Sequence, residues 1–387
     1  MRKNWFILLL CAASMSAQDI YTPVLNQVER NSPSLQAFRQ LAEAEQLAAK
    51  TGLAPHNPEV EFGYLWDKSG DDRKDVSVRQ GFDFPSVYAH RAKLADINTA
   101  GAELRFRRER QQLLLAAKQT CVRLVYLNAR LQLSEQRAER ADQLAQAYAR
   151  LMEKGACTQL EYNKAQINRT RALGDLQRTQ IERQTCLADL ARMAGEPVPF
   201  DHAEYEPLLL LSDFDTWYAE AENAMPALLA QHNAAEAAAR QVRLTRASAA
   251  PSFSVGYMGE FQSAQQLQGL TVGMALPLWS NAHRVRQAKA QALAATRTEE
   301  DTRLALRNRL QSLFAQAQAL QQTLAGYDVS LTDYNSAELL YHAFEGGELT
   351  LLQYLMESDY FFEAYDLRLQ TLRDLHLVTA EMNAWQL

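Results

Sequence analysis

The residues that most often do chemistry are scattered along this chain of 387 residues. No two of its histidines have the spacing of a metal site, and there is neither a phosphate-binding glycine loop nor a serine nucleophile motif. The sequence therefore predicts no catalytic site, no metal site and no cofactor, so we do not expect an enzyme. The histidines are His56, His90, His202, His232, His283, His342 and His376.

Carboxylates gather around a glycine pair, Gly346–Gly347. Glu345 and Glu348 flank the pair, and Glu357 and Asp359 follow about three helical turns later. In a single chain these are ordinary surface charges. Around a three-fold axis, each would form a ring of negative charge that favours cations, which makes the four acids candidates for an aperture.

Cysteines offer the other chemistry. Three cysteines follow the N-terminal segment, namely Cys121, Cys157 and Cys186. An odd number is unexpected for an exported chain, because an oxidising compartment favours paired thiols. If the chain folds back at Gly155, Cys186 lies within about one helical turn of Cys121. A Cys121–Cys186 disulfide and two buried free thiols both remain open, and Cys157 is left unpaired in either case.

The N-terminus predicts export. Residues 1–17 combine Arg2 and Lys3, a short apolar run and small residues, as in a cleaved signal peptide. The apolar run is shorter than the about 20 residues that a spanning helix needs. Lipidation of Cys11 is left open. The net charge of −6 argues against a nucleic-acid partner, which favours a basic surface.

The chain repeats itself at a nearly constant offset. "NPEVEFGY" at 57–64 matches "APSFSVGY" at 250–257, and "GACTQLEY" at 155–162 matches "GELTLLQY" at 347–354. In between, "FPSVYAHR" corresponds to "LPLWSNAHR". Such self-similarity indicates a duplicated structural unit. We predict repeats at 18–194 and 214–387, joined by a proline-containing linker at 195–213.

Long windows without proline predict long helices. No proline occurs between Pro85 and Pro197 or after Pro277, and apolar and small residues recur there with heptad spacing. In the first window we expect one helix over about 87–153 and a return helix that ends near residue 194. Many heptad positions are alanine, so the helices should pack closely.

Each helical hairpin is expected to turn at a glycine followed by a threonine. In the first repeat the predicted tip is at 154–158, where Gly155 ends one helix and Thr158 caps the next. In the second repeat the tip is at 345–350. The tip residues, which we interpret both as helix caps and as candidate docking residues, are Lys154, Gly155, Thr158, Leu160, Gly346, Gly347, Thr350 and Leu352.

Four short segments alternate apolar and polar residues, which predicts strands at about 58–66, 75–84, 251–261 and 269–278. Their length of about nine or ten residues suits a tilted strand that crosses an outer membrane. The alternative is a soluble four-stranded sheet that rests on the helices. Four strands cannot close a barrel, but three chains supply twelve. The predicted lipid-facing residues are Val60, Phe62, Tyr64, Phe253, Val255 and Tyr257.

Taken in order, these repeated segments resemble the TolC-like outer-membrane efflux protein family over about residues 25–385. The resemblance implies a mainly α fold with a small β part, assembled as a homotrimer with an α-helical barrel and a shared twelve-stranded transmembrane β-barrel in outer-membrane lipid. It also implies docking of the hairpin tips to a periplasmic adaptor and an inner-membrane pump. The family often has aspartates just after the second tip, where this chain has Gln353 and Met356.

The sequence thus predicts an outer-membrane channel that extends into the periplasm and conducts passively within a tripartite export system. The alternative is a periplasmic coiled-coil adaptor or scaffold. The cargo (a drug, a metal ion or a polypeptide) and the class of the pump are not specified by the sequence.

Overall fold

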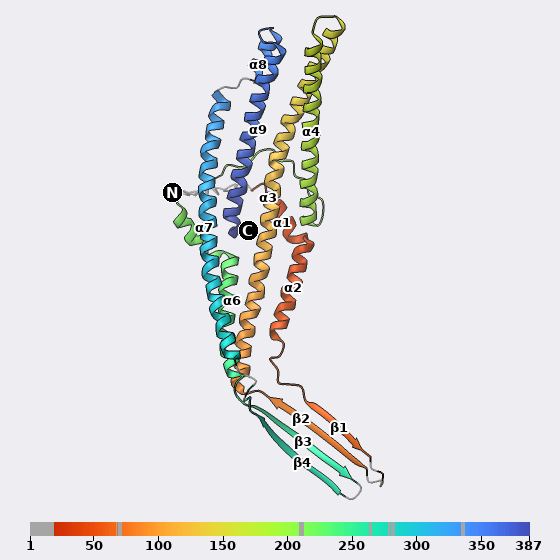
Figure 1. The fold of residues 1–387 in the computed structure, drawn as a ribbon, viewed down its shortest axis with the longest axis vertical. Coiled ribbons are helices and arrows are strands. Elements are labelled where there is room, and N and C mark those ends of the chain that lie inside the picture. The colour runs from red at the N-terminus through yellow and green to blue at the C-terminus, as the bar shows by residue number, and fades with distance from the viewer. Residues whose placement is uncertain are drawn as a thin grey trace, which may run out of the picture. The chain divides into compact units, whose positions relative to one another are not determined.

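The computed structural model is mainly helical, with one small antiparallel sheet (Figure 1). The chain divides into two compact units, which we describe separately. Unit 1 comprises residues 1–33, 114–210 and 316–381, and unit 2 comprises 34–113, 211–315 and 382–387. The predicted signal peptide lies outside the described residues. The described residues are 19–66, 68, 72–208, 213–262, 265–277, 279, 283–333 and 337–387.

Unit 1 is helical in its described part. Its elements are α1 (Thr22–Asn31), the later part of α3 (Pro85–Glu153), α4 (Gln159–Ala194), the last part of α7 (Arg284–Asp333), α8 (Ala337–Glu345) and α9 (Leu351–Met382).

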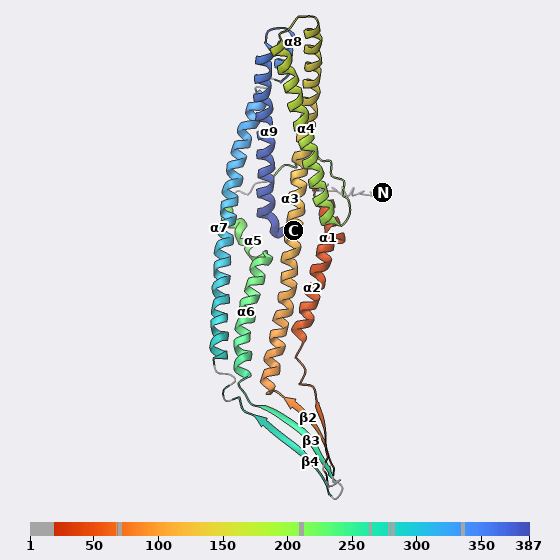
Figure 2. The ribbon, with the colours of Figure 1, turned by 45° about the vertical axis from the view of Figure 1, so that its right-hand side comes forward.

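The long helices of unit 1 lie side by side in the order α7, α9, α3, α4, as Figures 1 and 2 both show. Contacts agree with this order. Arg368 of α9 donates a hydrogen bond to Asp328 of α7 at 2.6 Å. Tyr126 and Leu127 of α3 pack with Leu369 of α9. α4 is joined to α3 through the small residues described next.

Small residues line the contact between α3 and α4. Ala138 and Ala141 of α3 cluster with Ala172 of α4, and all three are buried. Ala145 and Ala165, one or two turns nearer the tip, are also buried. The predicted close packing at alanine heptad positions is therefore confirmed in this hairpin. Alanine loses little conformational entropy in a helix and lets two backbones approach closely.

The first predicted hairpin matches the structure to within two residues, since α3 ends at Glu153 and α4 covers Gln159–Ala194. In the second, the described ascending arm consists of α7, which ends at Asp333, and α8, which begins at Ala337, and residues 334–336 lie outside the described residues.

Unit 2 contains the sheet and the helices that lead into it. Its elements are α2 (Pro33–Lys50), β1 (Glu59–Leu65), β2 (Arg73–Phe82), the first part of α3, α5 (Phe214–Ala224), α6 (Pro226–Ala247), β3 (Ser252–Gln262), β4 (Gln265–Ala275), the first part of α7 and a 3-10 turn (Asn383–Gln386).

The sheet has the order β1-β2-β3-β4, with every neighbouring pair antiparallel. β4 begins four residues earlier than predicted. Gln265, Gln266 and Gln268, which lie between the two predicted strands, continue the ladder, down to the pair Gln262 and Gln265. β1 is shorter than predicted, with seven residues. Polar residues can thus join a strand when the neighbouring strand supplies hydrogen-bond partners.

The end of α4 is held by a close backbone approach. Gly195 has a φ of 77°, in the left-handed region, and a Cβ there would lie 2.7 Å from the carbonyl oxygen of Asn31, at the end of α1. Side chains on both sides strengthen the contact, since Gln27 and Asn31 donate hydrogen bonds to Glu196 at 2.8 and 2.7 Å. Only glycine satisfies both the angle and the space.

Alanine substitutions at Gly195 and at Gly52 together separate the cost of steric overlap from the cost of backbone strain. Gly52 has a similar φ of 72°, but a Cβ there would meet nothing within 4 Å. We expect Gly52→Ala to lower the free energy of unfolding by about 1 kcal/mol, from the left-handed backbone alone. Gly195→Ala should cost about 2 kcal/mol more, because of the added overlap. Urea unfolding measures both, and equal losses would contradict the close approach.

Candidate functional site

The two hairpin tips of unit 1 share one local design. Each ascending helix ends at a glycine in the left-handed region, Gly155 with φ 69° or Gly347 with φ 74°. The following residue then donates its backbone N–H back to the last helical turn: Ala156 to Leu151 at 2.8 Å and Glu348 to Ala343 at 2.9 Å. This is the hydrogen-bond pattern of a Schellman cap.

A threonine then starts each descending helix. The Thr158 hydroxyl accepts from the Glu161 N–H at 3.2 Å, while the Glu161 carboxylate accepts from the Thr158 N–H at 2.8 Å. These hydrogen bonds hold the pKa of Glu161 below its usual value. Thr350 and Gln353 form the same reciprocal pair, at 3.3 and 3.0 Å. The predicted capping role of both threonines is confirmed.

The remaining tip residues are exposed. Lys154 and Gly346 lie on the turns themselves, and Leu160 and Leu352 begin the descending helices with exposed side chains. The second tip is braced by stacking of Phe344 on Tyr354, with ring centroids 4.7 Å apart. Both tips therefore present a rigid turn with an apolar side chain in solvent.

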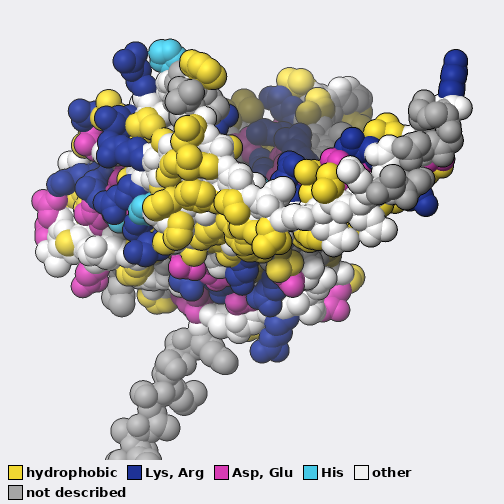
Figure 3. Space-filling view, turned by 90° about the horizontal axis from the view of Figure 1, so that it is seen from below, with side chains coloured by type: hydrophobic (Ala, Val, Ile, Leu, Met, Phe, Trp, Pro, Cys, Tyr) yellow, Lys and Arg dark blue, Asp and Glu magenta, His cyan; other side chains and the backbone are white. Residues whose placement is uncertain are grey.

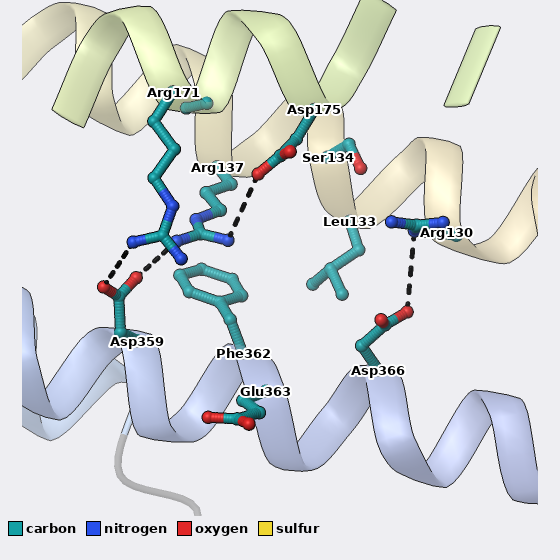
Figure 4. A pocket seen from close by; sticks show the side chains of 11 residues that line it. Arg130, Leu133, Ser134, Arg137, Arg171, Asp175, Asp359, Phe362, Glu363 and Asp366 are labelled. Carbon is teal, nitrogen blue, oxygen red and sulfur yellow. Dashed lines mark hydrogen bonds and ion pairs between the residues drawn. The ribbon is translucent and has the colours of Figure 1, made fainter. Parts of the chain in front are cut away.

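The four candidate aperture acids fall into two groups. Glu345, Glu348 and Glu357 are exposed, although Glu345 accepts a hydrogen bond from Tyr341 that raises the pKa of the tyrosine. Asp359 is half-buried and lies in an ion-pair cluster (Figure 4). The structure therefore does not bring the four acids together within one chain.

The ion-pair cluster joins α9 to both helices of the first hairpin. Asp359 of α9 accepts hydrogen bonds from Arg137 of α3 and from Arg171 of α4, the latter at 2.9 Å. Arg137 also lies 4.0 Å from Asp175 of α4, and its guanidinium sits over the ring of Phe362. One carboxylate is thus shared by two cations from two helices, beside a cavity of about 320 Å³.

The sequence did not identify these arginines. Arg137 and Asp359 are 222 residues apart, and each lies in a charge-rich helix where an exposed face is the ordinary interpretation. A weak signal existed, because Arg137 is directly followed by Ala138 of the alanine contact, which places its side chain at the border of a helix–helix interface.

The sheet of unit 2 separates apolar from polar side chains. Residues that pair directly across an antiparallel sheet point to the same face. The register pairs Val60 with Val78, Val78 with Tyr257, and Tyr257 with Leu270. All six predicted lipid-facing residues lie on this face. Figure 3, seen from below the view of Figure 1, shows hydrophobic side chains gathered in a patch bordered by charged ones.

The apolar face is far more exposed than a core would be. Val60 is 72% exposed and Leu270 is 84% exposed. The opposite face carries charged and hydroxyl groups around a hollow of about 720 Å³ that includes Glu59, Ser77 and Thr271.

The described residues contain no group of three or more His, Cys, Asp or Glu side chains that could hold a metal. Burial lowers the pKa of His376 to about 4 and raises that of Cys121 to about 12, so both are neutral near pH 7. The thiols of Cys121, Cys157 and Cys186 are free, so the structure contains no Cys121–Cys186 disulfide.

No helix in the described part of the chain combines the length and the apolar character needed to cross a membrane.

No protein-family model and no curated protein matches the chain. Solved structures do match it over nearly its full length. The CmeC outer-membrane channel of Campylobacter jejuni has a TM-score of 0.78 and 13% identity, covering 95% of this chain and 85% of that one. The outer-membrane channel OprN has a TM-score of 0.77 and 15% identity, covering 95% and 89%.

A third match is the open state of the MtrE outer-membrane channel of Neisseria gonorrhoeae. Its TM-score is 0.77 at 14% identity, covering 94% of this chain and 88% of that one. At identities this low, the TM-scores establish a common fold and nothing beyond it. The resemblance predicted from the repeated sequence segments is confirmed at this level: the chain has the fold of TolC-like outer-membrane channels.

Proposed function

We propose that this protein is the outer-membrane channel of a tripartite export system and acts as a homotrimer that conducts passively. The observation that carries the proposal is the sheet of unit 2, whose apolar face is exposed and whose two outer strands have no further partner in the described chain. Both features are costly for a single chain in water. An outer membrane and further copies of the chain would satisfy both.

The direction of the strands supports closure by identical copies. Neighbouring strands alternate in direction, so β1 and β4 run opposite to one another. The β4 strand of one copy can therefore pair antiparallel with β1 of the next copy. Three copies give twelve strands, an even number that closes with every pair antiparallel.

The polar face of the sheet would then line the lumen. Arg73 on β2 forms ion pairs with Asp75 at 2.8 Å and with Glu260 of β3 at 2.7 Å, so part of this surface is already neutralised. A lumen of paired charges, hydroxyls and glycines provides a wet path without a binding site of its own. Such a path fits conduction whose energy is supplied by a pump elsewhere, and we propose no enzymatic activity.

We propose that the hairpin tips dock to a periplasmic adaptor, which links the channel to an inner-membrane pump. Their rigid caps and the exposed Leu160 and Leu352 support this assignment. With the signal peptide predicted at residues 1–17, the protein would be exported, with its sheet in the outer membrane and its helices in the periplasm.

The ion-pair cluster is our candidate for the element that holds the periplasmic aperture closed. Asp359 attaches α9 to both α3 and α4, so an outward movement of α9 requires these ion pairs to separate. Because two arginines balance the negative charge of Asp359, a ring of negative charge would depend on the other three acids. These are Glu345, Glu348 and Glu357.

The alternative function is a periplasmic coiled-coil scaffold or adaptor. It is less well supported, since a scaffold in water would gain nothing from an exposed sheet face of this size. Fractionation distinguishes the two, because a scaffold would remain in the soluble periplasmic fraction.

The two faces of the sheet give the direct test of membrane insertion. We expect Phe62→Arg or Val255→Arg to cost about 2–4 kcal/mol in a membrane-assembly assay if these side chains lie near the middle of the bilayer. Ser77→Arg and Ser254→Arg, on the polar face, should assemble normally and change the single-channel conductance. Equal tolerance of Arg on both faces would rule out the proposed orientation.

The aperture assignment predicts that Asp359→Asn opens the channel more often. Loss of both ion pairs should raise the open fraction about fivefold, because two partly exposed ion pairs that share one carboxylate contribute about 1 kcal/mol together. Recordings in planar bilayers measure this fraction. Glu363→Gln is the matched control, since it removes the same charge from an exposed side chain about one turn along the same helix. If both variants behave alike, charge alone is responsible and the ion pairs do not hold the aperture.

A further inference from the structure

Three arginines of α3 follow one another at intervals of seven residues, namely Arg123, Arg130 and Arg137. Seven residues make about two helical turns, so the three side chains lie on one side of the helix. α9 and α4 lie on either side of α3, as Figures 1 and 2 show. We call each of these arginines, together with the residues of α4 and α9 at the same level, a rung.

In two of the three rungs, acids on both neighbouring helices balance the arginine. Arg130 lies 3.6 Å from Glu182 of α4 and 3.6 Å from Asp366 of α9. Arg137 has the corresponding partners on α4 and α9, which belong to the ion-pair cluster described above (Figure 4). Each of these two cations thus has a carboxylate on either side.

The third rung breaks this pattern. The partner acids of the other two rungs are seven residues apart on α4 and also on α9. Continuing these intervals leads to Asp189 on α4 and to Arg373 on α9, at the level of Arg123. A second cation therefore stands where the other rungs have an acid of α9. Asp189 forms no ion pair with any described residue, and Arg123 forms neither an ion pair nor a hydrogen bond with one.

A groove of about 510 Å³ opens at the third rung, between α4 and α9. Leu127 of α3 is buried at its floor, while Ile181 of α4 and Leu377 of α9 line its sides. Ile181 is 56% exposed, so an apolar ligand would remove much of its surface from water. The volume falls within the about 300–1,000 Å³ of small-molecule sites, which combine a mostly apolar lining with a few polar groups.

The segment that follows α4, residues 195–208, lies on another side of α3. The side chain of Asn128 donates hydrogen bonds to the carbonyl oxygens of Phe200 and His202 at 3.2 and 2.9 Å. Arg123 is five residues before Asn128, which places the two side chains about 140° apart around the helix. No residue of this segment lines the groove. The groove therefore stays open within the described chain.

The charges that line the groove leave one cation over. Glu182 is paired with Arg130, and Arg373 donates a hydrogen bond to Asp374 at 2.8 Å. The fourth charged side chain of the lining is Arg123, which has no such partner among the described residues. A negative charge is thus what the third rung lacks.

We propose that this groove binds a small amphipathic anion, with its apolar body against Leu127, Ile181 and Leu377 and its charged group at Arg123. The anion supplies the missing charge of the third rung and connects α4 with α9 there, as the acids do in the other two rungs. All the residues come from one chain, so the site goes beyond the proposed function and does not depend on the homotrimer.

The thiol of Cys186 provides a local readout, because it lines the groove and is only partly buried. The rate of its alkylation by N-ethylmaleimide is measured in the full-length protein in lipid nanodiscs, by mass spectrometry of the modified peptide. The probe is naphthalene-2-sulfonate, and 2-naphthylmethylammonium is the matched cation. Cys157, at the first hairpin tip, is the internal control. The midpoint of thermal unfolding is a second readout, because a ligand of the folded state raises it.

We expect the sulfonate to slow the alkylation of Cys186 and to raise the unfolding midpoint, while Cys157 reacts as before and the cation has neither effect. Arg123→Gln should weaken the protection at least about tenfold, because hydrogen bonds between charged groups are the stronger ones. The matched control is Arg150→Gln, which removes an exposed arginine of the same helix outside the groove. Protection is compared within each variant, since Arg123 itself lowers the pKa of the Cys186 thiol.

A second pair of variants tests the apolar side of the groove. Ile181→Asn should weaken the protection, whereas Ile167→Asn should not, because Ile167 is an exposed isoleucine of the same helix outside the groove. Equal protection by the cation, or protection that survives Arg123→Gln, overturns the proposal. So does a sulfonate without effect on either readout. A Cys186 that reacts no faster than the buried Cys121 also overturns it, since another molecule would then fill the groove.

Discussion

The constraint on which the structure depends is that one chain cannot satisfy its own sheet. Four antiparallel strands leave the outer edges of β1 and β4 without partners in the described chain, and they expose an apolar face that includes Val60 and Leu270. A hydrogen-bonding edge in water invites association, and an exposed apolar face of this kind favours a non-aqueous environment. In the proposed function, further copies provide the missing strands and lipid provides the environment. Everything proposed for function follows from these two requirements.

The helices meet the same requirement by different means. Within the first hairpin, alanines such as Ala138, Ala141 and Ala172 bring two helices close without a large core. The hairpin tips then depend on local hydrogen bonds, with Gly155 and Thr158 repeated as Gly347 and Thr350. Such an arrangement is stiff along each hairpin, while ion pairs such as Arg137–Asp359 join one hairpin to the other.

The sequence predicted the features that depend on local pattern. Proline-free heptads indicated the long helices, glycine and threonine indicated the tips, and alternation assigned Phe62 and Val255 to one face of the sheet. The sequence was less informative where contacts with distant elements determine the local structure. The early start of β4 at Gln265 depends on β3, and the partners of Asp359 come from helices that are distant in sequence.

The number of chains in the membrane-extracted particle tests the central claim most directly. Native mass spectrometry of the protein in lipid nanodiscs should give three copies per particle and no free monomer, because only closure removes both unpaired strand edges. A stable, monodisperse single chain in water without detergent would contradict the account, since it would show that one copy satisfies its own sheet.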